Sequence, residues 1–236
     1  MIRPILTGLF ACLLGAAASA QTTTWPERSV RLIVPFPAGS ATDIAMRLIE
    51  TALTPRLGHP VVIDNRSGAS GSIGVDAVAK AAPDGYTTGL VTVSTHAVAP
   101  GLGKKLPYDP TSDFTPVGMV GSTPYVLVTY PGLGAKNVKD LVAIAKAKPG
   151  SLNYGSAGPA SMAHLAAALL ATQTGISIVH VPYRSSAHAV TDIIAGRIQM
   201  QFATIPPSLE LITTQRLSAV AVSGARRSST LPGVPT

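Results

Sequence analysis

The stretch that most constrains the fold is residues 30–57, where a strand, a sharp loop and a helix follow one another. Residues 30–35 are rich in valine, isoleucine and leucine, as in a buried strand. Pro35 and Pro37 end this strand, because proline cannot donate a ladder hydrogen bond. Residues 42–57 show roughly helical spacing of apolar side chains. This order predicts a strand that leads through a tight loop into a helix.

The loop itself combines the residues expected at a helix N-terminus. Gly39 permits a tight turn, and Ser40 or Thr42 can cap the helix. Asp43 suits the first helical turn, where a carboxylate is stabilising, so we expect a structural role for it. Free backbone N–H groups and a helix N-terminus then converge on one point, which is the geometry that binds anions. The loop is predicted to form half of a carboxylate-binding site.

The same design returns further along the chain. A short strand at 152–155 leads into the small-residue loop 156–161, and a helix runs from Ser161 to about residue 174. Ser161 is a candidate N-cap, and Gly175 ends the helix. This second strand, loop and helix predicts the other half of the site.

Strands alternate with helices throughout the chain, which predicts an α/β fold with mainly parallel sheets and helices on both faces. The pattern restarts near residue 137, so we expect two lobes with a cleft between them. The predicted strands are 30–35, 61–65, 87–93, 117–130, 152–155, 176–181, 198–202 and 217–223, and the predicted helices are 42–57, 75–82, 138–148, 161–174, 187–195 and 209–214. Residues 97–116 and 203–207 are predicted to be irregular. The predicted division is residues 25–124 for lobe one, 125–224 for lobe two and 225–236 for the start of a return to lobe one.

A glycine-rich loop at 68–74 invites a cofactor interpretation. Its spacing is G-x-x-G-x-x-G, whereas a dinucleotide loop has G-x-G-x-x-G, and no Gly-Lys-Ser/Thr follows it. We therefore expect no cofactor and interpret the loop as one that packs a helix close to the sheet. A cofactor role is the alternative.

The first twenty residues are predicted to be a signal peptide. Arg3 is followed by an apolar run, and the small residues at 18–20 favour cleavage after Ala20. The alternatives are a lipoprotein box around Cys12 and a membrane anchor, for which the run is short. Cys12 is the only cysteine, so a mature chain without it has no disulfide, thiolate metal site or thiol catalysis.

The formal charge of +7 comes from scattered basic residues. Aromatic residues make up 5% of the chain and are not interleaved with the basic ones, which argues against nucleic-acid binding. The charge fits attraction of small anions, and a basic surface without a role is the alternative.

Seven ordered stretches carry a resemblance to a known family. They are Val-Arg-Leu-Ile-Val-Pro-Phe-Pro-Ala-Gly-Ser-Ala-Thr-Asp at 30–43, the Asn-Arg-x-Gly-Ala-x-Gly region within 61–74, Ala-Lys-Ala-Ala-Pro-Asp-Gly-Tyr within 77–86, Lys-Leu-Pro-Tyr-Asp-Pro-x-x-Asp-Phe at 105–114, Ala-Lys-x-Lys-Pro-Gly-x-Leu-Asn-Tyr at 145–154, His-Val-Pro-Tyr at 180–183 and Leu-Pro-Gly-Val-Pro-Thr at 231–236. Together they resemble the Bug-type solute receptors of tripartite tricarboxylate transporters, over essentially the whole mature chain.

The resemblance implies a two-lobed Venus-flytrap fold and a periplasmic, monomeric, non-enzymatic receptor. Such a receptor binds a small organic carboxylate (a di- or tricarboxylate or related anion) and delivers it to membrane permease subunits; no nucleic acid or cofactor is implied. Backbone amides, hydroxyls and ordered waters would hold the carboxylate. The ligand-binding residues that follow on this sequence are Pro37, Ala38, Gly39, Ser40, Thr42, Ser94 and Thr95 in lobe one, and Ser156, Ala157, Ser161, His164 and Thr204 in lobe two.

Three departures from the family pattern matter. Ser40 replaces a second glycine, which adds a hydroxyl and restricts the backbone. Ala203 and Thr204 stand where relatives often carry Asp-Asn. An acidic group there would select a ligand with an amine or a hydroxyl, so its absence argues for a plain or neutral-tailed carboxylate. The chain also stops at Thr236 where relatives continue, so we expect a truncated first lobe with exposed apolar surface.

Two alternatives remain. A serine hydrolase would use Ser156 or Ser161 with His164 and either Asp192 or Asp140, although neither serine lies in a G-x-S-x-G elbow. A non-functional truncated receptor is the other. A zinc site is rejected, because His180 and His188 lack acidic partners at ligand spacing.

Overall fold

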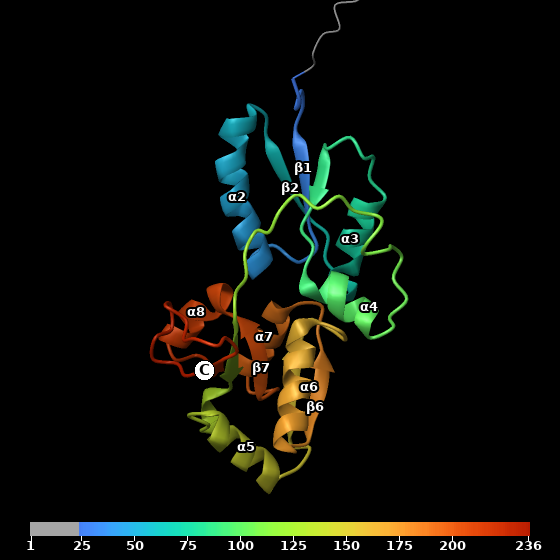
Figure 1. Ribbon diagram of the computed structural model, residues 1–236. Coiled ribbons are helices and arrows are strands. Elements are labelled where there is room, and N and C mark those ends of the chain that lie inside the picture. The colour runs from blue at the N-terminus through green and yellow to red at the C-terminus, as the bar shows by residue number, and fades with distance from the viewer. Residues whose placement is uncertain (1–23) are drawn as a thin grey trace, which may run out of the picture.

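The computed structural model describes residues 24–236, which form two α/β lobes, one above the other in Figure 1. The predicted signal peptide and Cys12 lie outside the described residues. The first lobe is built on a parallel sheet of order β2-β1-β3, made of β1 (Val30–Val34), β2 (Val61–Asn65) and β3 (Thr87–Gly89). The pairing of β1 with both other strands places it at the centre of this sheet, as its apolar sequence requires.

Helices cover both sides of the first sheet (Figure 1). On one side, α2 (Ala41–Leu57) packs Met46 against Leu32 and Val34 of β1. On the other, α3 (Ser72–Ala79) contacts β1 and β3. Three short helices complete the lobe: η1 (Ala69–Gly71), η2 (Ser94–Val98) and α4 (Ala99–Gly101).

The second lobe contains a five-stranded sheet of order β6-β5-β7-β4-β8. Its strands are β4 (Tyr125–Thr129), β5 (Leu152–Ser156), β6 (Ile178–Pro182), β7 (Met200–Thr204) and β8 (Ser218–Val222). Strand β5 pairs in parallel with β6 and β7, whereas β4 is antiparallel to β7 and β8. The predicted α/β fold with mainly parallel strands is confirmed, and β4 adds an antiparallel strand.

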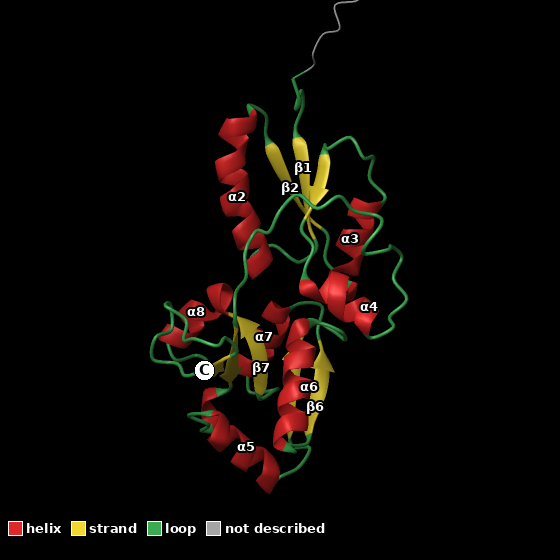
Figure 2. Cartoon of the chain, viewed as in Figure 1, coloured by secondary structure: helices red, strands yellow, loops and turns green. Residues whose placement is uncertain are grey.

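Helices also cover both faces of the second sheet (Figure 2). One core joins the sheet to α5 (Val138–Ala147) and α6 (Met162–Thr174), through residues such as Leu141 and Ala167. A separate core joins it to α7 (Ser186–Ile194) and α8 (Ile205–Thr213), through residues such as Ile193 and Ile205. A short turn, η3 (Pro131–Leu133), links β4 to α5. The segments that follow β5 and β7 contact the first lobe: the loop after β5 contacts Ser70, and α8 after β7 contacts α2.

Two predicted strands are shorter than expected. The strand predicted at 87–93 ends at Gly89, and Ser94 lies in the π-helical turn η2. The long strand predicted at 117–130 is only β4, because residues 117–124 pair with no strand in the described structure. Val117 is 94% exposed there. Apolar, β-branched sequence forms a strand only where a partner strand supplies the hydrogen bonds.

The predicted loop at 203–207 was also wrong. Strand β7 continues to Thr204 and α8 begins at Ile205, with prolines in its first turn. Proline lacks an N–H, and the first turn of a helix does not need one, so Pro206 and Pro207 start this helix and do not prevent it.

The last described residues pack on the second lobe. Leu231 is buried in the core of α7 and α8, and Val222 donates its N–H to Pro235 O at 2.7 Å. In the described chain, residues 225–236 therefore lie against the second lobe, whereas the sequence suggested the start of a return to the first. No helix within residues 24–236 has the length and apolar character that spanning a membrane demands.

Candidate functional site

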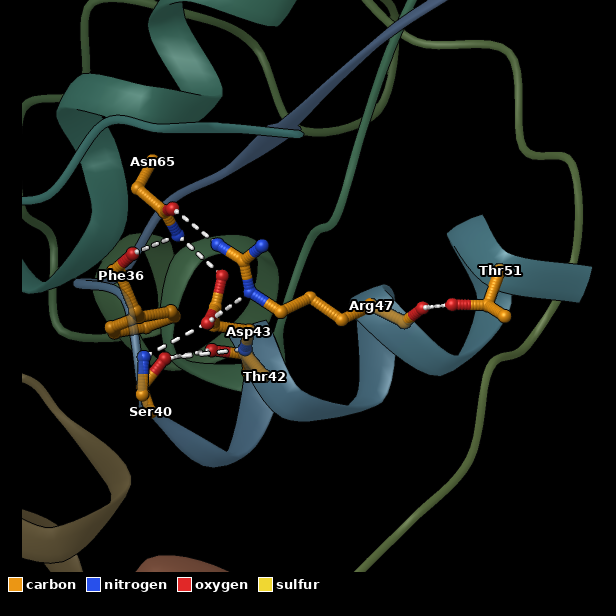
Figure 3. Close-up of polar contacts among 8 residues, drawn as sticks. Phe36, Ser40, Thr42, Asp43, Arg47, Thr51 and Asn65 are labelled. Atoms are coloured by element: carbon orange, nitrogen blue, oxygen red, sulfur yellow. Dashed lines mark hydrogen bonds and ion pairs between the residues drawn. The ribbon is translucent and has the colours of Figure 1, made fainter. Parts of the chain in front are cut away.

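The first-lobe loop, residues 35–40, leads into α2, whose N-terminus is capped by Ser40 (Figure 3). Ser40 is the N-cap, and its Oγ accepts the N–H of Asp43 at 3.2 Å and lies 2.9 Å from Thr42 Oγ1. The first intrahelical bond runs from Ile44 N–H to Ser40 O. The N–H groups of Ala41 and Thr42 precede that bond, so their acceptors must come from outside the helix.

Asp43 places a negatively charged side chain in the first turn of α2. It is 1% exposed, and Oδ2 accepts Gly39 N–H at 2.8 Å and Arg47 Nε at 2.9 Å. Oδ1 accepts Asn65 Nδ2, which also donates to Phe36 O (Figure 3). Burial raises the pKa of Asp43, but the hydrogen bonds from Arg47, Gly39 and Asn65 outweigh it and hold the pKa below its usual value. Asp43 is therefore structural, as expected.

The second-lobe loop, residues 156–161, joins β5 to α6. Ser156 is fully buried, with Oγ 2.7 Å from His180 Nε2 and 3.1 Å from the Gly158 N–H that it accepts. Ser161 is the N-cap of α6 and accepts His164 N–H at 3.3 Å. The predicted hydroxyl cap is present, and the two loops begin helices by the same device.

Two histidines lie behind the second-lobe loop. The rings of His164 on α6 and His180 on β6 have centroids 4.3 Å apart, and Tyr154 stacks on His180 at 4.9 Å. Burial, and then the charge of His164, lower the pKa of His180. His164 Nδ1 accepts Ala160 N–H at 3.4 Å. Both imidazoles are thus within hydrogen-bonding distance of groups in the loop.

The first lobe contacts the second-lobe loop through η1 and η2. Ser94 Oγ, in η2 of the first lobe, accepts the N–H of Met162 at the start of α6 at 3.1 Å. Ser70 Oγ, in η1, donates to Pro159 O at 2.8 Å and to Ala157 O at 3.3 Å. An apolar cluster fills the same interface and consists of Val98, Ala99, Leu106, Ala160, Met162 and Leu165.

The structure brings most predicted site residues to the facing ends of the lobes, but several already have protein partners. Gly39 N–H is bonded to Asp43, and Ser94 Oγ is bonded to Met162. Thr95 is 1% exposed, and its Oγ1 bonds the backbone of Thr92 in its own turn. Its hydroxyl does not face outward, because it lies inside a helical turn and not at a strand end. Pro37 and Ala38 lie in the first-lobe loop, and Thr204 precedes α8, which contacts α2.

Sequence reasoning missed Asn65, Ser70 and His180. Asn65 follows a strand in the same way as the predicted residues, so its place at a carboxyl end was a usable signal. Ser70 sits in the glycine-rich loop, which was interpreted as a packing loop, with a cofactor role as the alternative. The role of His180 depends on the pairing of β5 with β6, which the sequence does not reveal.

The triad considered for a hydrolase is not formed. Ser156 contacts His180 and not His164, and Asp192 binds Tyr183 Oη at 2.7 Å and Arg197 at 2.9 Å. A fully buried serine without an oriented acid behind its histidine is not an activated nucleophile.

Residues 45–236 match the family described as the tripartite tricarboxylate transporter family receptor. The protein BugT of Bordetella pertussis is 40% identical over 231 residues, which cover 97% of this chain and 71% of BugT. Several solved structures match over 90% of the chain, and two of them hold a ligand. Rpa4515 of R. palustris with adipate is 38% identical, with a TM-score of 0.85 over 71% of that chain. MatC (Rpa3494) from Rhodopseudomonas palustris with bound malate is 29% identical, with a TM-score of 0.83 over 72% of that chain.

Proposed function

The chain belongs to the tripartite tricarboxylate transporter receptor family, and from this we propose that it captures a small organic carboxylate and delivers it to the membrane permease of such a transporter. The family is one of periplasmic binding proteins and not of enzymes. One observation carries the proposal: α2 and α6 both begin from serine-capped loops, in two lobes that contact each other where Ser94 of the first lobe accepts the N–H of Met162 at the start of α6. Helix N-termini of this kind attract anions.

The proposed carboxylate donors of the first lobe are the N–H groups of Ala41 and Thr42 and the Thr42 hydroxyl. Both N–H groups lie in the first turn of α2, before the first intrahelical bond. The backbone N–H of Gly39, which the sequence favoured, is bonded to Asp43 and is not among them.

In the second lobe, the proposed donors are the N–H groups of Ala163 and Ala157, with the Ser161 hydroxyl beside them. Ala163 lies in the first turn of α6, before the bond from Leu165 N–H to Ser161 O. Ser156 and His164 shape this loop from behind. Lobe closure would bring the two sets of donors onto one carboxylate.

The proposed ligand is a plain dicarboxylate. Ala203 and Thr204 put no charge at the end of β7, so nothing there would select an amine. Two relatives are solved with adipate and with malate, which are both dicarboxylates. Asp43, the acidic residue at the first-lobe loop, has its carboxylate bonded to Gly39, Arg47 and Asn65.

The test is a thermal-shift and calorimetric screen with adipate, malate and citrate. A ligand that binds only the folded chain adds roughly 2.7 kcal/mol of stability when its concentration is about 100 times its Kd. That gain raises Tm by several degrees. The substitutions Thr42→Val and Ser161→Ala each remove a proposed donor or cap without changing charge, and each should weaken binding.

Matched controls exist for both variants. Thr51→Val removes a hydroxyl that donates to Arg47 O further along α2, and Ser151→Ala removes one that donates to Lys148 O. Equal affinity in Thr42→Val, Ser161→Ala and wild type would reject the site. No shift with any carboxylate would reject the function.

We also propose export and cleavage after Ala20, which residues 1–20 favour. Mass spectrometry of the secreted chain should then find Gln21 at its N-terminus, and a lipid on Cys12 would contradict this.

A further inference from the structure

Close packing accounts for Gly74 in the glycine-rich loop 68–74, but it does not account for Ser70 in the same loop. A Cβ on Gly74 would lie 2.7 Å from Arg66 O and from Pro35 Cα, so glycine is needed for close helix packing. Ser70 has no such role. It adopts a left-handed conformation with φ 58° and ψ 28°, which is uncommon for serine and turns its side chain toward the second lobe.

The Ser70 hydroxyl contacts the second-lobe loop at two carbonyls. It lies 2.8 Å from Pro159 O and 3.3 Å from Ala157 O, so one O–H is shared between them. Gly158 lies between these residues with φ 103°, and a Cβ there would be 3.1 Å from Ser70 Oγ. The serine therefore sits directly on the loop that begins α6.

Each carbonyl shares a planar peptide with an N–H that points the opposite way. The N–H paired with Ala157 O is that of Gly158, and it donates to Ser156 Oγ, which contacts His180. The N–H paired with Pro159 O is that of Ala160, and it donates to His164 Nδ1. Two hydrogen-bonded paths thus run from one hydroxyl of the first lobe, through the loop, to the two neighbouring histidines His164 and His180.

We propose that Ser70 is a positioning residue: its hydroxyl orients the second-lobe loop only when the lobes are in contact, so that lobe closure and the shape of the anion-binding loop are coupled. This inference rests on the proposed function, which makes residues 156–161 an anion-binding loop. The coupling itself is a property of the ligand-free chain. Removing one shared neutral hydrogen bond should weaken carboxylate binding about threefold to tenfold.

The experiment records imidazole NMR signals of His164 and His180 in the ligand-free protein. Ser70→Ala should shift both signals, because both rings are bonded to peptides that Ser70 holds. Ser151→Ala is the matched control, since it removes a serine bond to a carbonyl elsewhere in the second lobe. Ser70→Gly repeats the test without backbone strain, should the alanine variant fail to fold.

The outcomes separate this inference from the proposed function. Shifts of both histidines in a Ser70 variant, absent in Ser151→Ala, support the coupling. Unchanged histidine signals overturn it, even where adipate or malate binding is weakened. If wild type binds none of adipate, malate and citrate, the proposed function fails, and the histidine spectra still decide whether Ser70 positions the loop.

Discussion

The carboxylate of Asp43 accepts the backbone N–H of Gly39 at 2.8 Å and so closes the loop that begins α2. An aspartate in the third helical position reaches back over the cap in this way and satisfies an N–H outside the helix. The loop therefore has its own buried anion. In the proposed site, the ligand carboxylate would therefore bind the neighbouring N–H groups of Ala41 and Thr42.

Asp43→Asn should lower the free energy of unfolding by about 2 kcal/mol, because hydrogen bonds to a charged acceptor contribute roughly 1.5–3 kcal/mol. The amide would also point an N–H₂ group at donors from Gly39, Arg47 or Asn65. Urea denaturation measures the change. Arg47 is half exposed, so its ion pair adds little beyond this figure.

The control for that substitution is Asp113→Asn. Asp113 Oδ2 also accepts an N–H four residues back, from Asp109 at 2.7 Å, but in an exposed loop. We expect a change within about 0.5 kcal/mol there. Equal losses in the two variants would show that burial of Asp43 is unimportant.

Gly74→Ala should destabilise the first lobe by about 1–3 kcal/mol, because overpacked atoms must move. The atoms that the new methyl group meets at 2.7 Å are Arg66 O and Pro35 Cα, which belong to the backbone and cannot rotate away. Gly118→Ala is the control, since nothing lies within 4 Å of its Cβ. Thermal denaturation of both variants checks the difference, and similar Tm values would contradict the packing role.

Exposed apolar residues at 117–120 should make the chain associate. Val117 and Met119 are 94% and 91% exposed, in a segment without a partner strand. Val117→Ser with Met119→Gln should leave the unfolding free energy within about 0.5 kcal/mol of wild type and reduce aggregation. Light scattering at increasing concentration measures this, and undiminished aggregation would place its cause elsewhere.

The repeated strand, capped loop and helix was predictable because its signals are local. Ser40 and Ser161 cap their helices through contacts within three residues, and proline and glycine mark the ends. What failed depends on distant partners. Residues 117–124 have a strand-like sequence but no partner strand in the described structure. Ser94 Oγ accepts the N–H of Met162, which lies 68 residues away in the sequence. The helical turn at Thr95 was missed because a short apolar run fits a strand or a helix equally well. The start of α8 was missed because Pro206 and Pro207 also fit a loop.

Stability should fall as the pH drops from about 7.5 to about 5, because two histidines favour the neutral form in the folded chain. Burial, then the charge of His164, lower the pKa of His180 below 6.5, and burial lowers that of His96. The unfolded chain therefore binds more protons between the folded-state pKa and 6.5. This contribution is present above pH 6.5 and is lost as the pH falls through the folded-state pKa values. Urea denaturation across this range measures the slope.

His180→Gln should reduce that slope without abolishing it, since His96 contributes with the same sign. The carboxyls of Asp43 and Asp64 do not contribute to this slope, because their pKa values lie below 3.8 and therefore below the pH range of the measurement. An unchanged slope in His180→Gln would mean that the hydrogen bond between His180 and Ser156 survives protonation of the ring, with Nε2 donating to the serine oxygen.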